Sequence, residues 1–333
     1  MNIRNAFLAA SSAAVSILAL SGLALSGLTV SGTAMAQGKI TRIIVSFAPG
    51  GPVDAVARTL AEQLGKELGG RSVIVENKPG ANGAIGAQEV LKSEPDGSTI
   101  WITSVGAASI NPALYPNLQY NMQRDFAPVS LVVNNDELFV VNPNNPAKTV
   151  KDFVEASKKG KEAAMASSGI GSIPHLAIEQ LADATGAKLL HVPYKGAAPA
   201  ITDLLGGQVD GFFGDVPGLI SHVKAGRLKP LGMASTKRHP VLPDVPTLEE
   251  QGLKGLDTNN WYAFFVSSKT PASVVADLNK ATQAALNDTA VKTKLLAMGA
   301  DPAPSTSAQL ADVLKKDTEK WAKLIRAKNI QAE

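Results

Sequence analysis

Two glycine-rich turns are the parts of this chain best suited to chemistry. Residues 49–52 (PGGP) follow the β-branched, apolar residues 43–45, an order that predicts a buried strand, a tight turn and a helix start. Residues 169–174 (GIGSIP) follow residues 163–166 in the same order. Glycine leaves the backbone accessible and a helix N-terminus carries partial positive charge, so each turn could hold an anion without Lys or Arg. The alternative is a strand-to-helix turn without a ligand.

Several polar side chains beside these turns have both a structural and a ligand-binding interpretation. Asp54 is placed to accept N–H groups of the first turn and to favour its own helix dipole. Ser172 is either the N-cap of its helix or a ligand contact. Asp215 could accept from a ligand amine or hydroxyl, or cap the helix that begins near Pro217. His175 could donate to a ligand, although a structural role is favoured.

Loops at other strand ends add weaker candidates. Thr103 and Ser104 end the strand predicted over residues 98–103, and Ser109 lies just beyond. Tyr194 and Lys195 are the long polar residues of a loop in the second half of the chain, where Lys195 either balances an anion or is solvated. In a sheet with parallel strands such loops gather at one edge, where ligands bind.

Catalytic and metal-binding patterns are absent from the sequence. It has no G-x-S-x-G or H-E-x-x-H motif, and no cysteine. The 4 histidines are never three or four residues apart, so none forms a local metal pair. We therefore expect no enzyme activity, no cofactor and no metal site.

Composition and the first residues indicate an exported protein. The 333 residues carry a formal net charge of +3 with no long run of either sign, which argues against nucleic-acid or membrane-surface binding. Residues 1–36 combine Arg4, a long apolar stretch and the A-x-A site at residues 34–36, which predicts a signal peptide cleaved after Ala36. A membrane anchor is the alternative. Absence of cysteine fits a periplasmic protein.

The order of elements predicts an α/β protein with two lobes, each a mostly parallel sheet flanked by helices. Strands over residues 129–133 and 137–141, and a return strand over residues 261–266, would carry the chain between lobes as a two-strand hinge. Lobe 1 would contain residues 37–137 and 263–333, and lobe 2 residues 138–262. Residues 247–250 (TLEE) predict a short capped helix, and only helices are expected beyond the return strand.

The chain resembles the substrate-binding receptors of tripartite tricarboxylate transporters, also called the Bug family. Matching segments run in order through the chain: residues 47–58 (FAPGGPVDAVAR), 75–86 (VENKPGANGAIG), 169–176 (GIGSIPHL), 192–196 (VPYKG) and 203–210 (DLLGGQVD). The resemblance implies a type II periplasmic-binding fold that closes on a small carboxylate like a Venus flytrap. It also implies a partner made of one large and one small integral membrane subunit.

In this family the carboxylate is held largely by backbone amides and ordered water of the first turn, joined by the second turn on closure. The ligand-binding residues expected on these grounds, with the weaker rim candidates, are Phe47, Ala48, Pro49, Gly50, Gly51, Asp54, Thr103, Ser104, Ser168, Gly169, Gly171, Ser172, His175, Tyr194 and Asp215. We expect a monomeric periplasmic receptor that delivers its ligand to the transporter. A carboxylate sensor for a signalling partner and a secreted enzyme acting on small acids are the alternatives.

Overall fold

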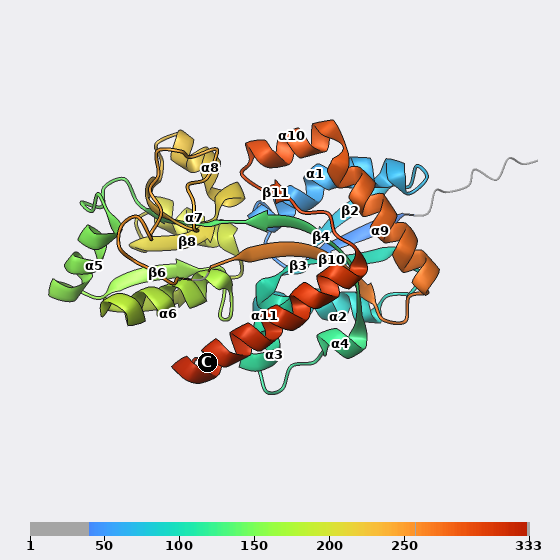
Figure 1. Ribbon diagram of the computed structural model, residues 1–333, viewed down its shortest axis with the longest axis horizontal. Helices are drawn as coiled ribbons and strands as arrows, with labels where there is room; N and C mark the ends of the chain where they lie inside the picture. Colours follow the sequence, from blue (N-terminus) through green and yellow to red (C-terminus); the bar gives the residue numbers. More distant parts are fainter. Residues whose placement is uncertain (1–39, 257, 332–333) are drawn as a thin grey trace, which may run out of the picture. The chain divides into compact units, whose positions relative to one another are not determined.

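The computed structural model describes residues 40–256 and 258–331, so the predicted signal peptide lies outside the described residues. The described residues form two sheets (Figure 1). The first sheet has the strand order β11-β4-β10-β3-β1-β2, and the second has the order β7-β6-β8-β5-β9.

The strands of the first sheet are β1 (Thr41–Val45), β2 (Val73–Asn77), β3 (Thr99–Ser104), β4 (Phe126–Asn135), β10 (Asn260–Ser267) and β11 (Asp301–Pro302). Those of the second are β5 (Glu137–Val141), β6 (Ala163–Ser167), β7 (Leu189–Pro193), β8 (Gly211–Asp215) and β9 (Lys229–Ala234). The helices of the first part of the chain are α1 (Pro52–Glu67), η1 (Ala81–Gly83), α2 (Ala84–Lys92), η2 (Gly106–Ile110), α3 (Asn111–Leu114) and α4 (Met122–Asp125). The later helices are α5 (Val150–Lys159), α6 (Ile173–Thr185), α7 (Ala197–Leu205), α8 (Val216–Lys224), α9 (Ala272–Asn287), α10 (Thr289–Ala297) and α11 (Ser307–Lys328).

Both sheets are mixed, which corrects the expectation of mostly parallel sheets, because the strands that join the two sheets add antiparallel pairs to each. β1 pairs parallel with β2 and β3, and β6 pairs parallel with β7 and β8. The strands that carry the chain from one sheet to the other pair antiparallel. β5 follows β4 after the single residue Asp136, so its first residue, Glu137, enters the second sheet opposite Asp215, the last residue of β8.

The second passage between the sheets reaches the same edge. β10 starts at Asn260, opposite Asn135 at the end of β4, and its Tyr262 lies opposite Ser104 at the end of β3. The first residues of β5 and β10 therefore lie with the carboxyl ends of β3 and β8. This edge is where the predicted ligand loops leave the parallel strands.

The C-terminal helices pack against the N-terminal elements (Figure 1). Leu278 and Leu286 of α9 share a buried cluster with Leu60 and Leu64 of α1. Trp321 of α11 shares a second cluster with strands of the first sheet. Burial of these large apolar side chains explains why the chain returns to the first sheet after completing the second.

Two local predictions were wrong. The tail contains a short strand, β11, because Asp301 and Pro302 pair with the edge of β4. Residues 247–252 form turns rather than a helix. Their capping-box bonds are present, from Thr247 N–H to Glu250 Oε2 (2.7 Å) and from Glu250 N–H to Thr247 Oγ1 (3.0 Å). A bridge between Thr247 and Met233 of β9 holds the start of the segment extended, and no further turn follows.

Candidate functional site

The first glycine turn is held by Asp54, as the sequence predicts. Gly50 adopts a positive φ of 79°, and its N–H donates to Asp54 Oδ2 at 3.0 Å. Arg58 Nε donates to the same oxygen at 2.9 Å, and Asn77 Nδ2 donates to Asp54 Oδ1 at 2.9 Å. Burial alone raises the pKa of Asp54, but the donors from Arg58, Gly50 and Asn77 outweigh it and lower the pKa. Asp54 therefore shapes the turn as a charged carboxylate.

This arrangement uses up one N–H group that had been expected to bind the ligand. Gly50 donates to Asp54, and both Pro49 and Gly50 are exposed. Phe47 is only 8% exposed, so most of its side chain is buried in the protein. Among the hydrogen bonds of residues 40–256 and 258–331, none uses the N–H of Val53, in the first turn of α1. The donor left available at this turn among the described residues is thus at the helix start, whereas the Gly50 N–H is already used.

The second turn is also tied together internally. Ser172 is the N-cap of α6: its Oγ accepts from His175 N–H at 3.4 Å and donates to the Gly169 carbonyl at 2.7 Å. Gly169 N–H donates to Ser167 Oγ at 3.1 Å, and Gly171 N–H donates to His175 Nδ1 at 3.1 Å. His175 thus has the structural role expected of it, since it accepts at Nδ1 and so carries its proton at Nε2.

The ring of His175 stacks on His191 at a centroid distance of 3.9 Å. His191 Nε2 lies 2.6 Å from Ser167 Oγ, at the end of β6. Burial, followed by the nearby His175, lowers the pKa of His191 to about 4. A neutral His191 thus contacts Ser167, whose Oγ accepts from Gly169 N–H in the second turn.

Two cavities lie between the turns. The inner cavity measures about 20 Å³ as the space open to the centre of a water molecule. It is lined by Phe47, Pro52, Val53, Ser104, Ser168, Ser172, Ile173, Pro174, Ala197, Asp215, Asn260 and Tyr262. The outer cavity, measured in the same way, is about 190 Å³ and includes Gly169, Tyr194 and Lys195. Phe47 and Ser168 line both cavities. Loops from the two sheets thus meet around them.

Four helix starts surround the inner cavity. Val53 belongs to α1, Ile173 to α6 and Ala197 to α7, and Asp215 immediately precedes α8. Helix N-termini carry partial positive charge, so their convergence favours an anion. As with Val53, no hydrogen bond in the described part of the chain uses the N–H of Ala197. Ala197 was not among the predicted ligand contacts, although Gly196 and Pro199 around it do mark a helix start.

The side chain of Asp215 does not cap α8, one of the two roles predicted for it. It occupies the N-cap position of α8 without a side-chain cap bond. Its Oδ1 accepts from Asn260 Nδ2 at 2.8 Å, and its Oδ2 accepts from the Tyr262 hydroxyl. Burial raises the pKa of Asp215 to about 6. Burial and the adjacent Asp215 also raise the pKa of Glu137, which is 0% exposed.

Glu137, Asn260 and Tyr262 are site residues that the sequence analysis missed. Two residues of opposite sheets, Asp215 and Asn260, are joined directly here. Neither Glu137 oxygen accepts a hydrogen bond within the described chain, but a protonated Glu137 can donate to Asp215. Only the polar character of these residues was visible in the sequence.

The remaining candidates separate into lining and buried residues. Ser104 and Ser168 line the inner cavity. Thr103 and Ser109 are 0% exposed and do not line either cavity, and their hydroxyls lack partners among the described residues. Tyr194 lines the outer cavity, but its hydroxyl donates to Asp203 Oδ2 at 2.6 Å. Burial and Asp203 raise the pKa of Tyr194 to about 12.

Glycines allow the two halves of the site to approach closely. A Cβ on Gly196 would lie 3.2 Å from the Ala48 nitrogen, and one on Gly218 would lie 3.2 Å from the Pro52 ring. A Cβ on Gly106 would lie 3.1 Å from the carbonyl oxygen of Gly171. Neither cavity is lined by the first-turn residues Ala48, Pro49, Gly50 and Gly51. Ala48 instead contributes to the close contact between the two halves.

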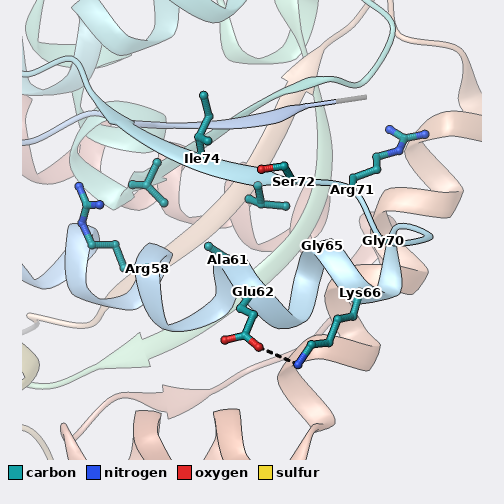
Figure 2. Close-up of a pocket in the computed structure, with 11 residues that line it drawn as sticks. Arg58, Ala61, Glu62, Gly65, Lys66, Gly70, Arg71, Ser72 and Ile74 are labelled. Carbon is teal, nitrogen blue, oxygen red and sulfur yellow. Dashed lines mark ion pairs between the residues drawn. The ribbon is translucent and has the colours of Figure 1, made fainter. Parts of the chain in front are cut away.

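A larger hollow of about 790 Å³ lies between α1 and the edge strand β2, away from these residues. Figure 2 shows Arg58, Lys66 and Arg71 around it, with Glu62 paired to Lys66 at 2.8 Å. Its ion pair is exposed, and exposed pairs contribute little. None of the predicted ligand residues lines it, so we place the candidate site at the inner cavity.

Comparison with known families decides the kind of protein. Residues 56–330 match the model of the tripartite tricarboxylate transporter family receptor. The chain belongs to this receptor family. A Pseudomonas sp. (strain P51) relative, described as a UPF0065 protein in the tcbD-tcbE intergenic region, is 37% identical over 85% of this chain and 84% of its own length. Protein BugT of Bordetella pertussis is 33% identical over 86% of this chain and 88% of its own.

Solved structures of the receptor family have the same fold. The periplasmic binding protein BugD has a TM-score of 0.85 and 35% identity, covering 88% of this chain and 99% of its own. MatC of Rhodopseudomonas palustris, with bound malate, has a TM-score of 0.81 and 31% identity, covering 86% and 99%. Another R. palustris protein, with adipate, has a TM-score of 0.84 and 29% identity, covering 87% and 97%. Family and fold are those of periplasmic solute-binding proteins, and no helix of the described residues could span a membrane.

Proposed function

We propose that this protein is a periplasmic receptor that captures a small carboxylate and delivers it to a tripartite tricarboxylate-type transporter. The observation that carries the proposal is the convergence of α1, α6, α7 and α8 N-termini on one buried cavity. Membership of the receptor family and the malate and adipate bound to its structural neighbours support it.

The carboxylate binds where both halves of the site contribute. Val53 N–H, from the side of the first sheet, and Ala197 N–H, from the side of the second, are the backbone donors we assign to it. Hydrogen bonds to a charged group contribute roughly 1.5–3 kcal/mol each, and bridging waters add further contacts at little cost. Because donors come from both sheets, the ligand stabilises the closed arrangement more than an open one and so drives closure.

The mobile units we propose are lobe 1, with residues 37–137 and 263–333, and lobe 2, with residues 138–262. The hinge is then formed by the β4–β5 link at Asp136 and the entry to β10. We further propose that residues 1–36 direct export and are cleaved after Ala36, and that the receptor acts as a monomer with one large and one small membrane subunit. It binds its ligand stoichiometrically and without turnover.

Thermal unfolding in the presence of candidate ligands tests the proposal. Protein refolded to remove carried-over ligand is heated with mono-, di- and tricarboxylates, acidic and neutral amino acids, aromatic acids and sugars. A true ligand at 100 times its Kd adds about 2.7 kcal/mol to the free energy of unfolding. We expect at least one carboxylate to stabilise the protein and to be recovered unaltered. Stabilisation by uncharged compounds alone would refute the anion site, and chemical conversion of the ligand would refute the receptor.

A further inference from the structure

The outer side of β2 is an unpaired edge of the first sheet. Among the described residues β2 pairs only with β1, in parallel. Thr41 N–H of β1 donates to the Ser72 carbonyl at 2.8 Å. Because alternate residues of a strand bond to the same neighbour, the next residue, Val73, and then Val75 direct their N–H and C=O groups away from β1. This edge can therefore pair with a further strand.

The other sheet edges contain a proline, and β2 does not. The edge strands of the two sheets in the described residues are β2, β7, β9 and β11. Pro193 lies in β7, Pro230 in β9 and Pro302 in β11, whereas β2 has the sequence VIVEN. Proline lacks the N–H that a further strand needs, and it is one means by which proteins keep sheet edges from pairing. β2 thus retains a pairing edge of a kind that the other edge strands restrict.

The hollow of about 790 Å³ beside α1 extends along this edge. Ala61 and Gly65 are the small residues that α1 contributes to its lining, and Val73 and Val75 contribute apolar surface. Figure 2 shows Ala61 and Gly65 on the helix, with β2 running beside it. An extended peptide suits this geometry, because a strand edge supplies backbone hydrogen bonds and a groove beside it accepts alternate side chains.

Cationic side chains predominate around the hollow. Its lining includes Arg58, Lys66 and Arg71, against the acidic side chain of Glu62. Lys66 and Glu62 form an exposed ion pair, and such pairs contribute little, so a partner's carboxylate can replace Glu62 at small cost. The Arg71 side chain forms no hydrogen bond or ion pair among the described residues. These charges favour a partner with acidic side chains.

The positions of the arginines also limit which strand can pair here. Arg58 donates to Asn77, the last residue of β2, at 3.2 Å, and Arg71 is two residues before the first, Val73. Figure 2 shows the two arginines towards opposite ends of the hollow. A second copy of this chain that paired through β2 would bring these cations together, and like charges on paired strands are destabilising. A strand with an acidic residue at each end meets a cation at each end instead.

We propose that β2 and the hollow beside α1 form a docking surface for an extended acidic segment of a partner protein, which adds to the first sheet as a further strand. Backbone groups of Val73 and Val75 hold the segment, and Arg58, Lys66 and Arg71 select its acidic side chains. The hollow shares no lining residue with the inner or the outer cavity. The inference is therefore independent of the carboxylate ligand and goes beyond the proposed function.

Capped, dye-labelled peptides of about seven residues test the proposal by fluorescence anisotropy with residues 37–333. The acidic peptide alternates valine and threonine between terminal glutamates, the basic peptide has lysines in place of the glutamates, and a third has a central proline. We expect the acidic peptide to bind about fivefold or more tightly than the basic one, and the central proline to remove binding. Affinity should fall as NaCl is raised from about 0.05 to about 0.5 M.

Val75→Pro gives β2 the edge proline that the other edge strands have. Its outward N–H is lost while the bonds to β1 remain, so we expect the acidic peptide to bind at least about fivefold more weakly. Leu189→Pro is the matched control on the edge strand β7. Ala163 N–H donates to the Lys188 carbonyl, so the next N–H, that of Leu189, also points away from the neighbouring strand. Peptide binding should be native in this control.

Arg71→Glu tests the charge without altering the strand. We expect the acidic peptide to bind about fivefold or more weakly to this variant, and the basic peptide to bind more tightly. Lys161→Glu makes the same change of charge at an exposed residue outside the hollow and should leave both affinities native. If Val75→Pro does not fold, Arg71→Glu with this control still decides.

Three results would overturn the proposal. The first is no binding of the acidic peptide at up to about 1 mM, and the second is equal binding of the acidic and basic peptides. The third is a concentration-dependent dimer of residues 37–333 that Val75→Pro abolishes, which would assign the edge to a second copy of the chain. None of these results bears on the carboxylate site, which the thermal screen tests separately.

Discussion

Two buried aspartates show how their surroundings decide what a carboxylate does in this protein. Asp54 is 4% exposed and Asp215 is 8% exposed. Donors around Asp54, including the Arg58 guanidinium, lower its pKa despite burial. Asp215 faces another carboxyl group and no cation, so burial prevails and raises its pKa. The first residue is committed to holding a turn, whereas the second retains capacity for a ligand.

Asp54→Ala is expected to destabilise the protein. The substitution leaves Gly50 N–H and Asn77 Nδ2 without their acceptor, so we expect a loss of about 1–3 kcal/mol in the free energy of unfolding. Urea denaturation at pH 7 measures it. Arg58→Ala is the comparison variant, because it removes only the exposed partner of Asp54. Exposed ion pairs contribute about 0–1 kcal/mol, so this variant should lose less stability than Asp54→Ala. Equal losses for both variants would contradict the role of Asp54 in the turn.

Asp215 is expected to make stability fall as pH rises. Its folded pKa of about 6 is above the ordinary value of 3.8, so its contribution is fully present below pH 3.8 and is lost as pH rises through 6. Glu137 and Asp136 are the neighbouring carboxyl groups, with Tyr262 and Asn260 as donors. We therefore expect the free energy of unfolding of Asp215→Asn, measured relative to that of the native chain, to rise by roughly 1–3 kcal/mol between pH 4 and pH 7.

Urea midpoints of both proteins at pH 4, 5.5 and 7 measure this difference. Glu137 interacts with Asp215, so its titration is part of the measured difference, whereas distant carboxylates cancel when the two proteins are compared. A constant difference between Asp215→Asn and the native chain across this range would show that Asp215 does not titrate there.

At the scale of elements, the proposed site uses helix starts where many anion sites use lysines and arginines. α1, α6, α7 and α8 follow strands β1, β6, β7 and β8, and parallel pairing places the ends of such strands at one edge. Each helix start brings backbone donors and partial positive charge without a flexible side chain. A donor of this kind can be removed while the helix is kept.

Ala197→Pro is expected to weaken carboxylate binding at least about tenfold, the equivalent of one hydrogen bond to a charged group. Proline suits the first position of a helix, so α7 should persist while the Ala197 N–H is replaced by ring carbons. Calorimetry with the ligand found in the thermal screen measures the affinity. Thr289→Pro is the matched control, because Thr289 is the first residue of α10, is exposed and lies away from the cavity. Unchanged affinity in Ala197→Pro would remove α7 from the site.

At the scale of the whole molecule, the two sheets are joined by more than the strands that run between them. Ile173 and Leu176 of α6 share a buried cluster with Trp321 and Ile325 of α11. Lys328, at the end of α11, forms an ion pair with Asp183 of α6. Contacts made only by close approach, at glycines such as Gly218, add to these. We therefore expect affinity to depend on positions that never touch the ligand.

Gly218→Ala tests this dependence. Its Cβ would lie 3.2 Å from the Pro52 ring, so the Pro52 ring and Gly218 must move apart by a few tenths of an ångström. Overpacking of this kind costs about 1–3 kcal/mol, and we expect affinity to fall about fivefold or more while the ligand-free protein stays as stable. Calorimetry and urea denaturation separate the two effects. Gly206→Ala is the control, since its Cβ would approach nothing closer than 3.5 Å. Native affinity in Gly218→Ala would show that this contact does not limit closure.

Local chemistry in the sequence determined the parts of this protein that depend on neighbours along the chain. Gly50 adopts a positive φ, and Pro52 suits a first helical turn. Asp54 is four residues from Gly50, whose N–H donates to its carboxylate. The Ser172 cap follows from the same short-range geometry. The family motifs added the two-lobed fold and the receptor function. The composition of the cavity beyond the two turns did not follow from them.

Tertiary structure alone decided which distant residues meet around Asp215. Asp215, Glu137 and Asn260 meet because the chain passes between the sheets twice at one edge and pairs antiparallel there. No spacing along the chain encodes that meeting, because it depends on strand order and register. The same physics misled the prediction for residues 247–252, where pairing with β9 outweighs a well-formed capping box. Local patterns specify turns and caps, whereas long-range pairing specifies the pocket.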